Sequence, residues 1–155
     1  MRRSARLAVE SLEGKALLSG AVVTASGLSE SLTATPSRTT AGTSIVLTFT
    51  ETNVTDHDIS VTLAQSTDGF VASKGGRPVW TSNPGVQPGI VTVETLKPGQ
   101  SLTLSETWDG VSNTSAGGPA LKGRFVIHNE LAPDGPTATV TLLPAVAAAK
   151  SPHKR

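Results

Sequence analysis

Short runs of alternating apolar and polar side chains, separated by turn residues, make up most of this chain. The clearest run is 45–50, where Ile45, Leu47 and Phe49 alternate with a valine and two threonines. Successive side chains of an extended strand point to opposite faces, so such a run has one apolar face and one polar face. Similar runs recur about every eight to twelve residues between 30 and 143. The pattern predicts an all-β domain of about seven to nine short strands.

The segments between these runs carry residues that favour tight turns. Gly75 and Gly76 follow a short apolar run and accommodate the positive φ angles of a hairpin. Pro98 and Gly99 are typical of a four-residue turn. Pro78 has no backbone N–H to donate, so we expect its strand to lie at the edge of a sheet.

The run 59–64 follows a predicted turn at 53–56, and we expect it to pair with 45–50 in an antiparallel hairpin. Strands with one apolar face are buried together only in a two-sheet sandwich or a barrel. We therefore predict an immunoglobulin-like antiparallel β-sandwich with flexible termini. The remaining strands are expected at 32–34, 70–72, 77–80, 90–94, 102–108, 124–128 and 138–142.

The charge is unevenly distributed along the chain, and its distribution suggests three parts. Residues 1–27 carry four Lys/Arg and two Asp/Glu and contain a short apolar run, as an export or sorting segment does. Residues 28–144 hold all the predicted strands and form the predicted domain. The last part, 145–155, has a net charge of +3 and is expected to be a disordered basic tail.

The N-terminal stretch from Arg6 to Ser19, RLAVESLEGKALLS, resembles the LExRxLLS sorting segment of many planctomycete surface and secreted proteins. Lys15 stands where that segment usually has arginine. The resemblance implies an extracellular or cell-envelope location. The alternative is a cytoplasmic protein whose N-terminus forms an amphipathic helix, with Leu7 and Leu12 on its apolar stripe.

Composition excludes several classes of protein. Cysteine is absent, so there are no disulfides and no thiolate ligands or nucleophiles. The segment 28–149 carries six Lys/Arg against ten Asp/Glu, and the whole chain has only five aromatic residues. A basic, aromatic-rich surface for nucleic acid is therefore not expected. No stretch approaches the ~20 consecutive apolar residues of a membrane span.

Candidate catalytic and metal-binding residues are few. His57 lies between Asp56 and Asp58, but adjacent residues of an extended chain point to opposite faces, so we expect a solvated turn rather than a metal site. His128 falls in a strand pattern and is expected at the surface. The scattered carboxylates of Glu94, Glu106 and Glu130 are expected to be solvated, and no nucleophile–base motif is present. We expect no enzyme activity, no catalytic residue, no cofactor and no metal.

Several short motifs occur in an ordered series over 44–142. They are Gly-Phe-Val at 69–71, Gly-Arg-Pro-Val-Trp at 76–80, Leu-Lys-Pro-Gly-Gln at 96–100, Trp108, and Gly-Arg-Phe-Val at 123–126. In order and spacing they resemble the BsuPI family of intracellular proteinase inhibitors. The family usually has a second tryptophan soon after Val-Trp, where this chain has Thr-Ser-Asn. The residues that carry the resemblance are Phe70, Val79, Trp80, Pro98, Gly99, Trp108 and Phe125.

The resemblance implies a protein partner, such as a protease, bound by surface loops of a rigid sandwich. Two loops are candidates, 81–89 and 109–119, and the first is stiffened by its prolines. We expect Trp80 and Trp108 to be core residues rather than ligand platforms. The residues of the candidate binding loop are Asn83, Pro84, Val86, Gln87 and Pro88.

A second hypothesis is a non-inhibitory extracellular or cell-surface module with a structural or interaction role. Immunoglobulin-like sandwiches carry many unrelated functions, so the fold alone does not choose between the two. The threonine-rich strand faces and the N-terminal sorting segment suit a surface protein. The sequence leaves the oligomeric state open.

Overall fold

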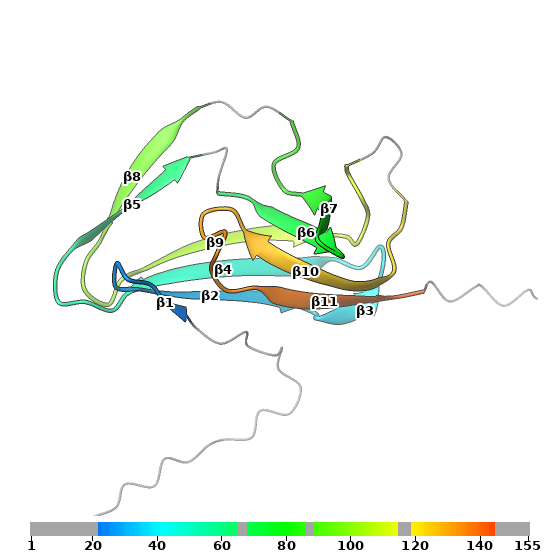
Figure 1. Cartoon of the computed structure of the whole chain (residues 1–155), viewed down its shortest axis with the longest axis horizontal. Coiled ribbons are helices and arrows are strands. Elements are labelled where there is room, and N and C mark those ends of the chain that lie inside the picture. The colour runs from blue at the N-terminus through cyan, green and yellow to red at the C-terminus, as the bar shows by residue number, and fades with distance from the viewer. Residues whose placement is uncertain (1–21, 65–67, 86–88, 115–118, 145–155) are drawn as a thin grey trace, which may run out of the picture.

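The computed structural model describes residues 22–64, 68–85, 89–114 and 119–144. These residues form an all-β structure without a helix, in which the strands make two facing layers (Figure 1). The predicted fold class is therefore confirmed. The strands are β1 (Val22–Val23), β2 (Leu28–Thr35), β3 (Arg38–Thr40), β4 (Ile45–Asn53), β5 (Ile59–Ala64), β6 (Phe70–Lys74), β7 (Arg77–Thr81), β8 (Val91–Leu96), β9 (Ser101–Trp108), β10 (Gly123–Asn129) and β11 (Ala138–Leu143).

The chain crosses directly from one sheet to the other between β2 and β3. One sheet has the order β1-β2-β4-β9 and the other β3-β11-β10-β6-β7. Near Pro36 the chain leaves β2 and enters the second sheet as β3, which runs parallel to β11, whereas the other pairs are antiparallel. A strand that switches sheets in this way makes a corner of the sandwich. The arrangement is immunoglobulin-like.

The main core fills the space between the two sheets. In β2 and β4 every second side chain is buried, as the alternation predicts. Trp108 lies at its centre, 5.8 Å from Trp80 and 5.5 Å from Phe125 between ring centroids. Burying one large apolar side chain contributes roughly 1.5–3 kcal/mol, so this core is the main source of stability. Its largest fully buried apolar residues are Trp108, Phe49, Phe70, Phe125, Leu32, Ile45, Leu47, Ile127, Leu142 and Val140.

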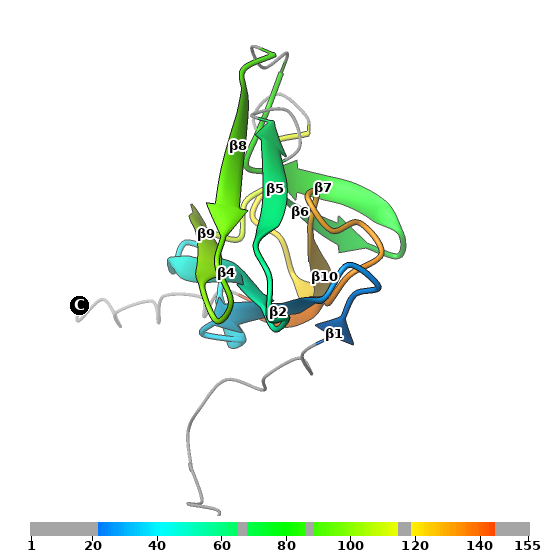
Figure 2. The ribbon, with the colours of Figure 1, turned by 90° about the vertical axis from the view of Figure 1, so that its left-hand side faces the viewer.

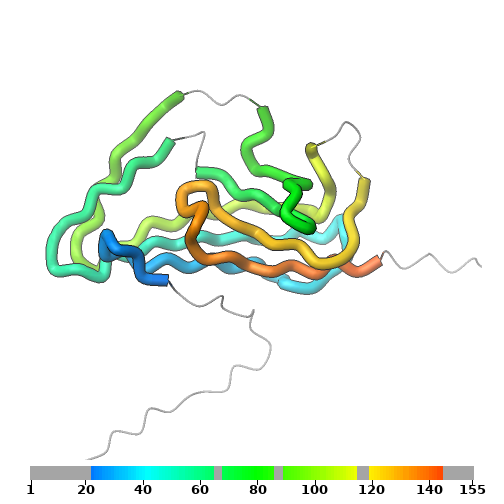
Figure 3. Tube along the Cα trace, viewed as in Figure 1, coloured from blue at the N-terminus to red at the C-terminus, as the bar shows by residue number. Residues whose placement is uncertain are grey.

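Strands β5 and β8 form a separate two-stranded ribbon that rises from one end of the molecule (Figures 2 and 3). The predicted hairpin between 45–50 and 59–64 is therefore wrong, because β5 pairs with β8 and β4 pairs with β2 and β9. The ribbon rests on a small second core of Leu28, Val61 and Leu96.

A buried asparagine fixes the angle at which the ribbon leaves the sheet. The Nδ2 of Asn53 donates to the carbonyl of His57 at 2.7 Å and to that of Leu96 at 2.8 Å. Its Oδ1 accepts the N–H and the hydroxyl of Thr55. The chain reverses at both corners, β4 to β5 and β8 to β9, and Asn53 holds the two corners together. It is fully buried and its side chain is fully hydrogen-bonded.

The turn predictions agree with the structure. Gly75, Gly76 and Gly99 have φ angles of 57°, 77° and 79°, in the left-handed region that glycine favours. Pro78 lies in β7, the outermost strand of its sheet, as expected. Two strands were missed, β1 and β3, because they are only two and three residues long and show no alternation.

β1 pairs with β2, so the sheet includes residues ahead of residue 28, inside the segment assigned to export. The rest of that segment, 1–21, and the predicted tail 145–155 lie outside the described residues. Within the described part of the chain, no helix has the length and apolar character needed to cross a membrane.

Candidate functional site

The two predicted binding loops leave neighbouring positions on the sandwich and are bonded to each other through Asn113. Its Nδ2 donates to the carbonyl of Thr81 at 2.7 Å, and its Oδ1 accepts the N–H of Thr81 at 3.0 Å. Its backbone N–H donates to the carbonyl of Val79 at 3.2 Å. Asn113 thus pairs with the open edge of β7 as a strand residue would. We call the segments 81–85 and 109–114 the loop pair.

Further hydrogen bonds attach the second loop, 109–114, to β7 and to the main core. The hydroxyl of Ser112 donates to the carbonyl of Val79 at 2.8 Å, and Ser112 is buried. The indole Nε1–H of Trp108 donates to the carbonyl of Val111 at 3.1 Å. Asp109 accepts the N–H of Val111 on Oδ1 at 3.0 Å. The loop is therefore fixed both to the edge of β7 and to a tryptophan of the main core.

The first loop is anchored on its other side by the start of β6. The backbone N–H of Phe70 donates to the hydroxyl of Ser82 at 2.8 Å, and the N–H of Ser82 donates to the carbonyl of Phe70 at 2.9 Å. The Nδ2 of Asn83 lies 3.4 Å from Oδ1 of Asp68. A Cβ built on Gly69 would lie 2.5 Å from Asn83 Nδ2, so a larger residue there would displace the Asn83 side chain.

The predicted loop residues are only partly placed by the structure. Asn83 is half-buried and Pro84 is exposed. Val86, Gln87 and Pro88 lie outside the described residues, as does the part of the second loop between 115 and 118. The described part of the candidate site is therefore the base of both loops.

The residues that carry the family resemblance fall into two groups. Phe70, Trp108 and Phe125 are fully buried, Trp80 is 8% exposed, and Val79 is half-buried beside them. The two tryptophans are core residues, as expected, and they support the loop pair from beneath. Pro98 and Gly99 lie in the exposed turn between β8 and β9, at the other end of the sandwich (Figure 1).

His57 is exposed, as expected, whereas His128, which was expected at the surface, is half-buried. Asp56 and His57 are exposed, with 3.2 Å between Asp56 Oδ1 and His57 Nδ1, and this hydrogen bond holds the pKa of Asp56 below its usual value. Asp58 is exposed, and His128 is half-buried in β10. Among the described residues, no three His, Cys, Asp or Glu side chains come together as metal ligands would.

A buried pair of carboxylates was not expected from the sequence. Glu30 of β2 and Glu51 of β4 are direct cross-strand partners and are 6% and 3% exposed. Burial and, to a lesser extent, the neighbouring charge of Glu30 together raise the pKa of Glu51 to about 7. Burial also raises the pKa of Glu30. Two adjacent buried carboxylates cannot both ionise cheaply, so the pair tends to keep a proton.

One carboxylate oxygen of the pair is buried without a partner. Among the described residues, Oε2 of Glu51 has no hydrogen-bond partner. A hollow of about 300 Å³ opens beside Glu30, next to the turn at Ala132–Gly135. The alternation itself carried the signal, because Glu30 and Glu51 occupy positions of β2 and β4 whose neighbours two residues away are buried.

The outward face of the first sheet is covered with hydroxyl groups. Three hydroxyl pairs bridge β4 and β9, Thr48 to Ser105 at 3.0 Å, Thr50 to Thr103 at 3.4 Å and Thr52 to Ser101 at 2.8 Å. Such cross-strand pairs stabilise a sheet modestly. Val46 is the one residue of this face on β2, β4 and β9 that has no hydroxyl group. The others are Ser29, Ser31, Thr33, Thr35, Thr48, Thr50, Thr52, Ser101, Thr103, Ser105 and Thr107.

Comparison with known proteins assigns no family to this chain. No family model matches it and no curated protein matches it. Solved structures that resemble it include a β-glucosidase from Listeria innocua in complex with glucose, at 13% identity and a TM-score of 0.43, which covers 74% of this chain and 16% of that one. A β-glucosidase from Erythrobacter marinus resembles it at 13% identity and a TM-score of 0.46, over 75% of this chain and 16% of that one. The chain thus spans about a sixth of each enzyme.

Proposed function

We propose that this protein is a protein-binding module of the proteinase-inhibitor type that binds its partner through the loop pair. The proposal rests on one observation, the double hydrogen bond between the Asn113 side chain and the backbone of Thr81. A loop that is already ordered loses less conformational entropy when it docks. A rigid loop also resists the rearrangement that cleavage by a protease requires.

The family resemblance supports a protease as the partner. The motifs at 69–71, 76–80 and 123–126 surround the base of the loop pair, and their aromatic residues form the core beneath it. The N-terminal resemblance supports export, so the proposed targets are proteases of the envelope or the extracellular space. No catalytic residue and no cofactor is part of the proposal.

The test is a titration of the full chain against a panel of subtilisin-like serine proteases and metalloproteases, with residual peptidase activity as the readout. We expect at least one protease to be inhibited at micromolar concentration or below. Asn113→Ala removes both side-chain bonds to Thr81 and is expected to weaken inhibition at least tenfold. The matched control is Thr48→Ala, which removes one exposed hydroxyl pair on the far sheet and is expected to inhibit like the parent.

A panel on which neither the parent chain nor any variant inhibits would remove the inhibitor proposal for those proteases. Equal inhibition by the parent and Asn113→Ala would remove the loop pair as the contact surface.

The hydroxyl-covered face favours a second candidate, a non-inhibitory module at the cell surface. This face has no charged side chain among its twelve positions on β2, β4 and β9, and three of its cross-strand pairs are hydrogen-bonded. A neutral polar face of this kind suits a protein that lies against other envelope material. Retention in the envelope fraction together with no affinity for any protease of the panel would favour this candidate over the first.

A further inference from the structure

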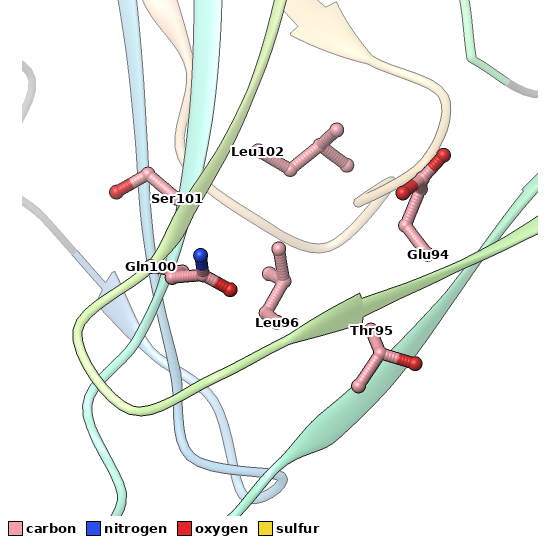
Figure 4. Close-up of a pocket in the computed structure, with 6 residues that line it drawn as sticks. All are labelled: Glu94, Thr95, Leu96, Gln100, Ser101 and Leu102. Carbon is pink, nitrogen blue, oxygen red and sulfur yellow. The ribbon is translucent and has the colours of Figure 1, made fainter.

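A cleft lies at the opposite end of the sandwich from the loop pair, where the ribbon leaves the first sheet. It has a volume of about 400 Å³ and lies between β8 and the start of β9. Leu96 and Leu102 point into the space between the two strands, and Glu94 lies farther out along β8 (Figure 4). The residues that line it are Glu94, Thr95, Leu96, Gln100, Ser101 and Leu102.

Hydrogen bonds at the corner give the cleft a fixed shape. Asn53 bonds the carbonyl of Leu96, and the backbone N–H of Asn53 donates to the carbonyl of Gln100 at 2.9 Å. The side chain of Gln100 accepts the N–H of Lys97 at 2.9 Å, which closes the turn. The floor is continuous with the small core, because Leu96 is buried there and Leu102 packs against it. The cleft therefore exists before any partner arrives.

Two open strand edges border this cleft on one side of the molecule. β9 is the last strand of its sheet, and β8 belongs to a sheet of two strands, so each has one edge without a strand partner among the described residues. Figure 2 shows β8 and β9 on the same side. An open edge presents backbone N–H and C=O groups that can pair with another extended chain.

The edge of β8 lacks the proline, the lysine and the register shift by which edge strands often block such pairing, and its one charged residue is Glu94. All its residues but Leu96 are exposed, and it contains no proline, lysine or arginine. Val91 and Val93 are 59% and 61% exposed on the face of the ribbon opposite Glu94. The edge strand β7, in contrast, carries Pro78 and a register shift in its pairing with β6. A two-stranded ribbon is also marginal alone, and a third strand would stabilise it.

The charges at the cleft define the partner further. Glu94 lines the cleft and is exposed. Within the described residues, the only ion pair joins His57 to Asp56, so Glu94 has no cationic partner there within 4.0 Å. Side chains two residues apart on a strand share a face, as Leu96 and Glu94 do. A strand added to β8 would therefore place one residue against the leucine floor and the next residue of that face against Glu94.

We infer that this cleft binds an extended segment of a partner protein, which adds to β8 as a third strand of the ribbon. The segment has an apolar residue that contacts Leu96 and Leu102, and a lysine or arginine two residues away that pairs with Glu94. This surface is separate from the loop pair, so it stands whether or not the loop pair inhibits a protease.

The test uses the full, isotope-labelled chain and a synthetic nine-residue peptide that is blocked at both ends. Every second residue of the peptide is threonine, which forms one face of the extended chain. The other face carries valine and lysine in turn. Backbone amide shifts in the NMR spectrum are followed during titration. We expect saturable shifts confined to the region 91–102. A peptide of the same composition with valine and lysine on opposite faces should bind at least tenfold more weakly. A peptide N-methylated at the amides of one edge should also bind at least tenfold more weakly.

Charge reversal gives the decisive control. Glu94→Lys should weaken binding of the lysine peptide at least tenfold and should strengthen binding of a peptide with glutamate in place of lysine. Asp134→Lys makes the same charge change at an exposed residue of another loop and should alter neither affinity. Glu94→Gln, which removes the charge without reversing it, should give an intermediate affinity and guards against a folding defect in the lysine variant.

Three results would overturn the inference. These are the absence of shifts in 91–102 at millimolar peptide, equal affinity of the N-methylated peptide, and failure of the charge swap. Shifts confined to 81–85 and 109–114 would place the peptide on the loop pair and would also overturn it.

Discussion

Each end of this sandwich has one asparagine whose side chain bonds two backbone segments together, but the two asparagines differ in burial and in what they join. At one end Asn53 is fully buried and joins the corners of the ribbon. At the other end Asn113 is exposed and joins two loops. The loop end lies over a core of fifteen buried residues, whereas the ribbon rests on three. The comparison indicates that the ribbon depends on the hydrogen bonds of Asn53 for its stability. The core beneath the loop pair, in contrast, is stable without the hydrogen bonds of Asn113.

We expect Asn53→Ala to lower the free energy of unfolding more than any other substitution considered. This change removes the donor to the buried carbonyl of Leu96 and one of two donors to the carbonyl of His57, which keeps the Thr55 hydroxyl. A buried polar group left unsatisfied costs about 1–3 kcal/mol. We expect a loss of about 3 kcal/mol in the free energy of unfolding, measured by urea denaturation. The matched change Asn113→Ala should cost far less, and equal losses for the two variants would contradict the contrast between the two ends.

The buried carboxylate pair, Glu30 and Glu51, should make the free energy of unfolding depend on pH. The pKa of Glu51 is raised to about 7 in the folded chain, so the folded state holds its proton more tightly than the unfolded state does. Stability is therefore greatest below the ordinary glutamate pKa and falls as pH rises toward 7. By linkage the loss is about 2–3 kcal/mol between pH 4 and pH 8.

Glu51→Gln should remove most of this loss and should be more stable than the parent at pH 8. Urea denaturation at pH 4 and at pH 8 measures the free energy of unfolding of both chains. Glu94→Gln changes an exposed glutamate and serves as the control, with the pH dependence of the parent. A parent chain more stable at pH 8 than at pH 5 would contradict the buried pair.

A pair of identical substitutions compares the two cores directly. Val140 is fully buried in the main core and Val61 is 7% exposed in the small one. We expect Val140→Ala to cost about 2 kcal/mol and Val61→Ala about 1 kcal/mol, because fewer neighbours surround the second valine. Amide hydrogen exchange should show Val61→Ala loosening 59–64 and 91–96 alone. Uniform loosening of all strands by Val61→Ala would show that the ribbon is not a separate unit.

The smallest expected effect on stability is that of Asn113→Ala, below about 1 kcal/mol. Its bonds are exposed to water, which can replace the lost partners of Thr81. The melting temperature should change little, while exchange at the base of the loop pair accelerates. A large drop in melting temperature would mean that Asn113 stabilises the sandwich itself.

Local patterns predicted the strands well, because alternation is a property of each strand alone. The bounds near Ile45, the hairpin at Gly75–Gly76 and the edge position of Pro78 followed from residue types at neighbouring positions. The partner of β5 did not, because the choice between β4 and β8 depends on residues far apart in the chain. The turn at 53–56 was predicted, but the bond from Asn53 to the carbonyl of Leu96, which ties β8 to this corner, joins residues 43 positions apart.

The candidate site shows the same division. Proline and glycine marked both loops, but the bond between Asn113 and Thr81 joins residues 32 positions apart and could not be read from either loop. The burial of Glu30 and Glu51 was not predicted, although both acids stand two residues from buried positions of an alternating strand. That they face each other required the register of β2 against β4.

The claim that carries the proposed function is that the two loops are joined in the free protein, before any partner binds. Amide hydrogen exchange of Thr81, followed by NMR in the unbound full chain, tests it most directly, because that N–H has Asn113 Oδ1 as its acceptor. We predict clear protection in the parent and its loss in Asn113→Ala, with the amide of Ser82, which donates to Phe70, still protected in both. Exchange of Thr81 in the parent as fast as in an unfolded chain would contradict the account.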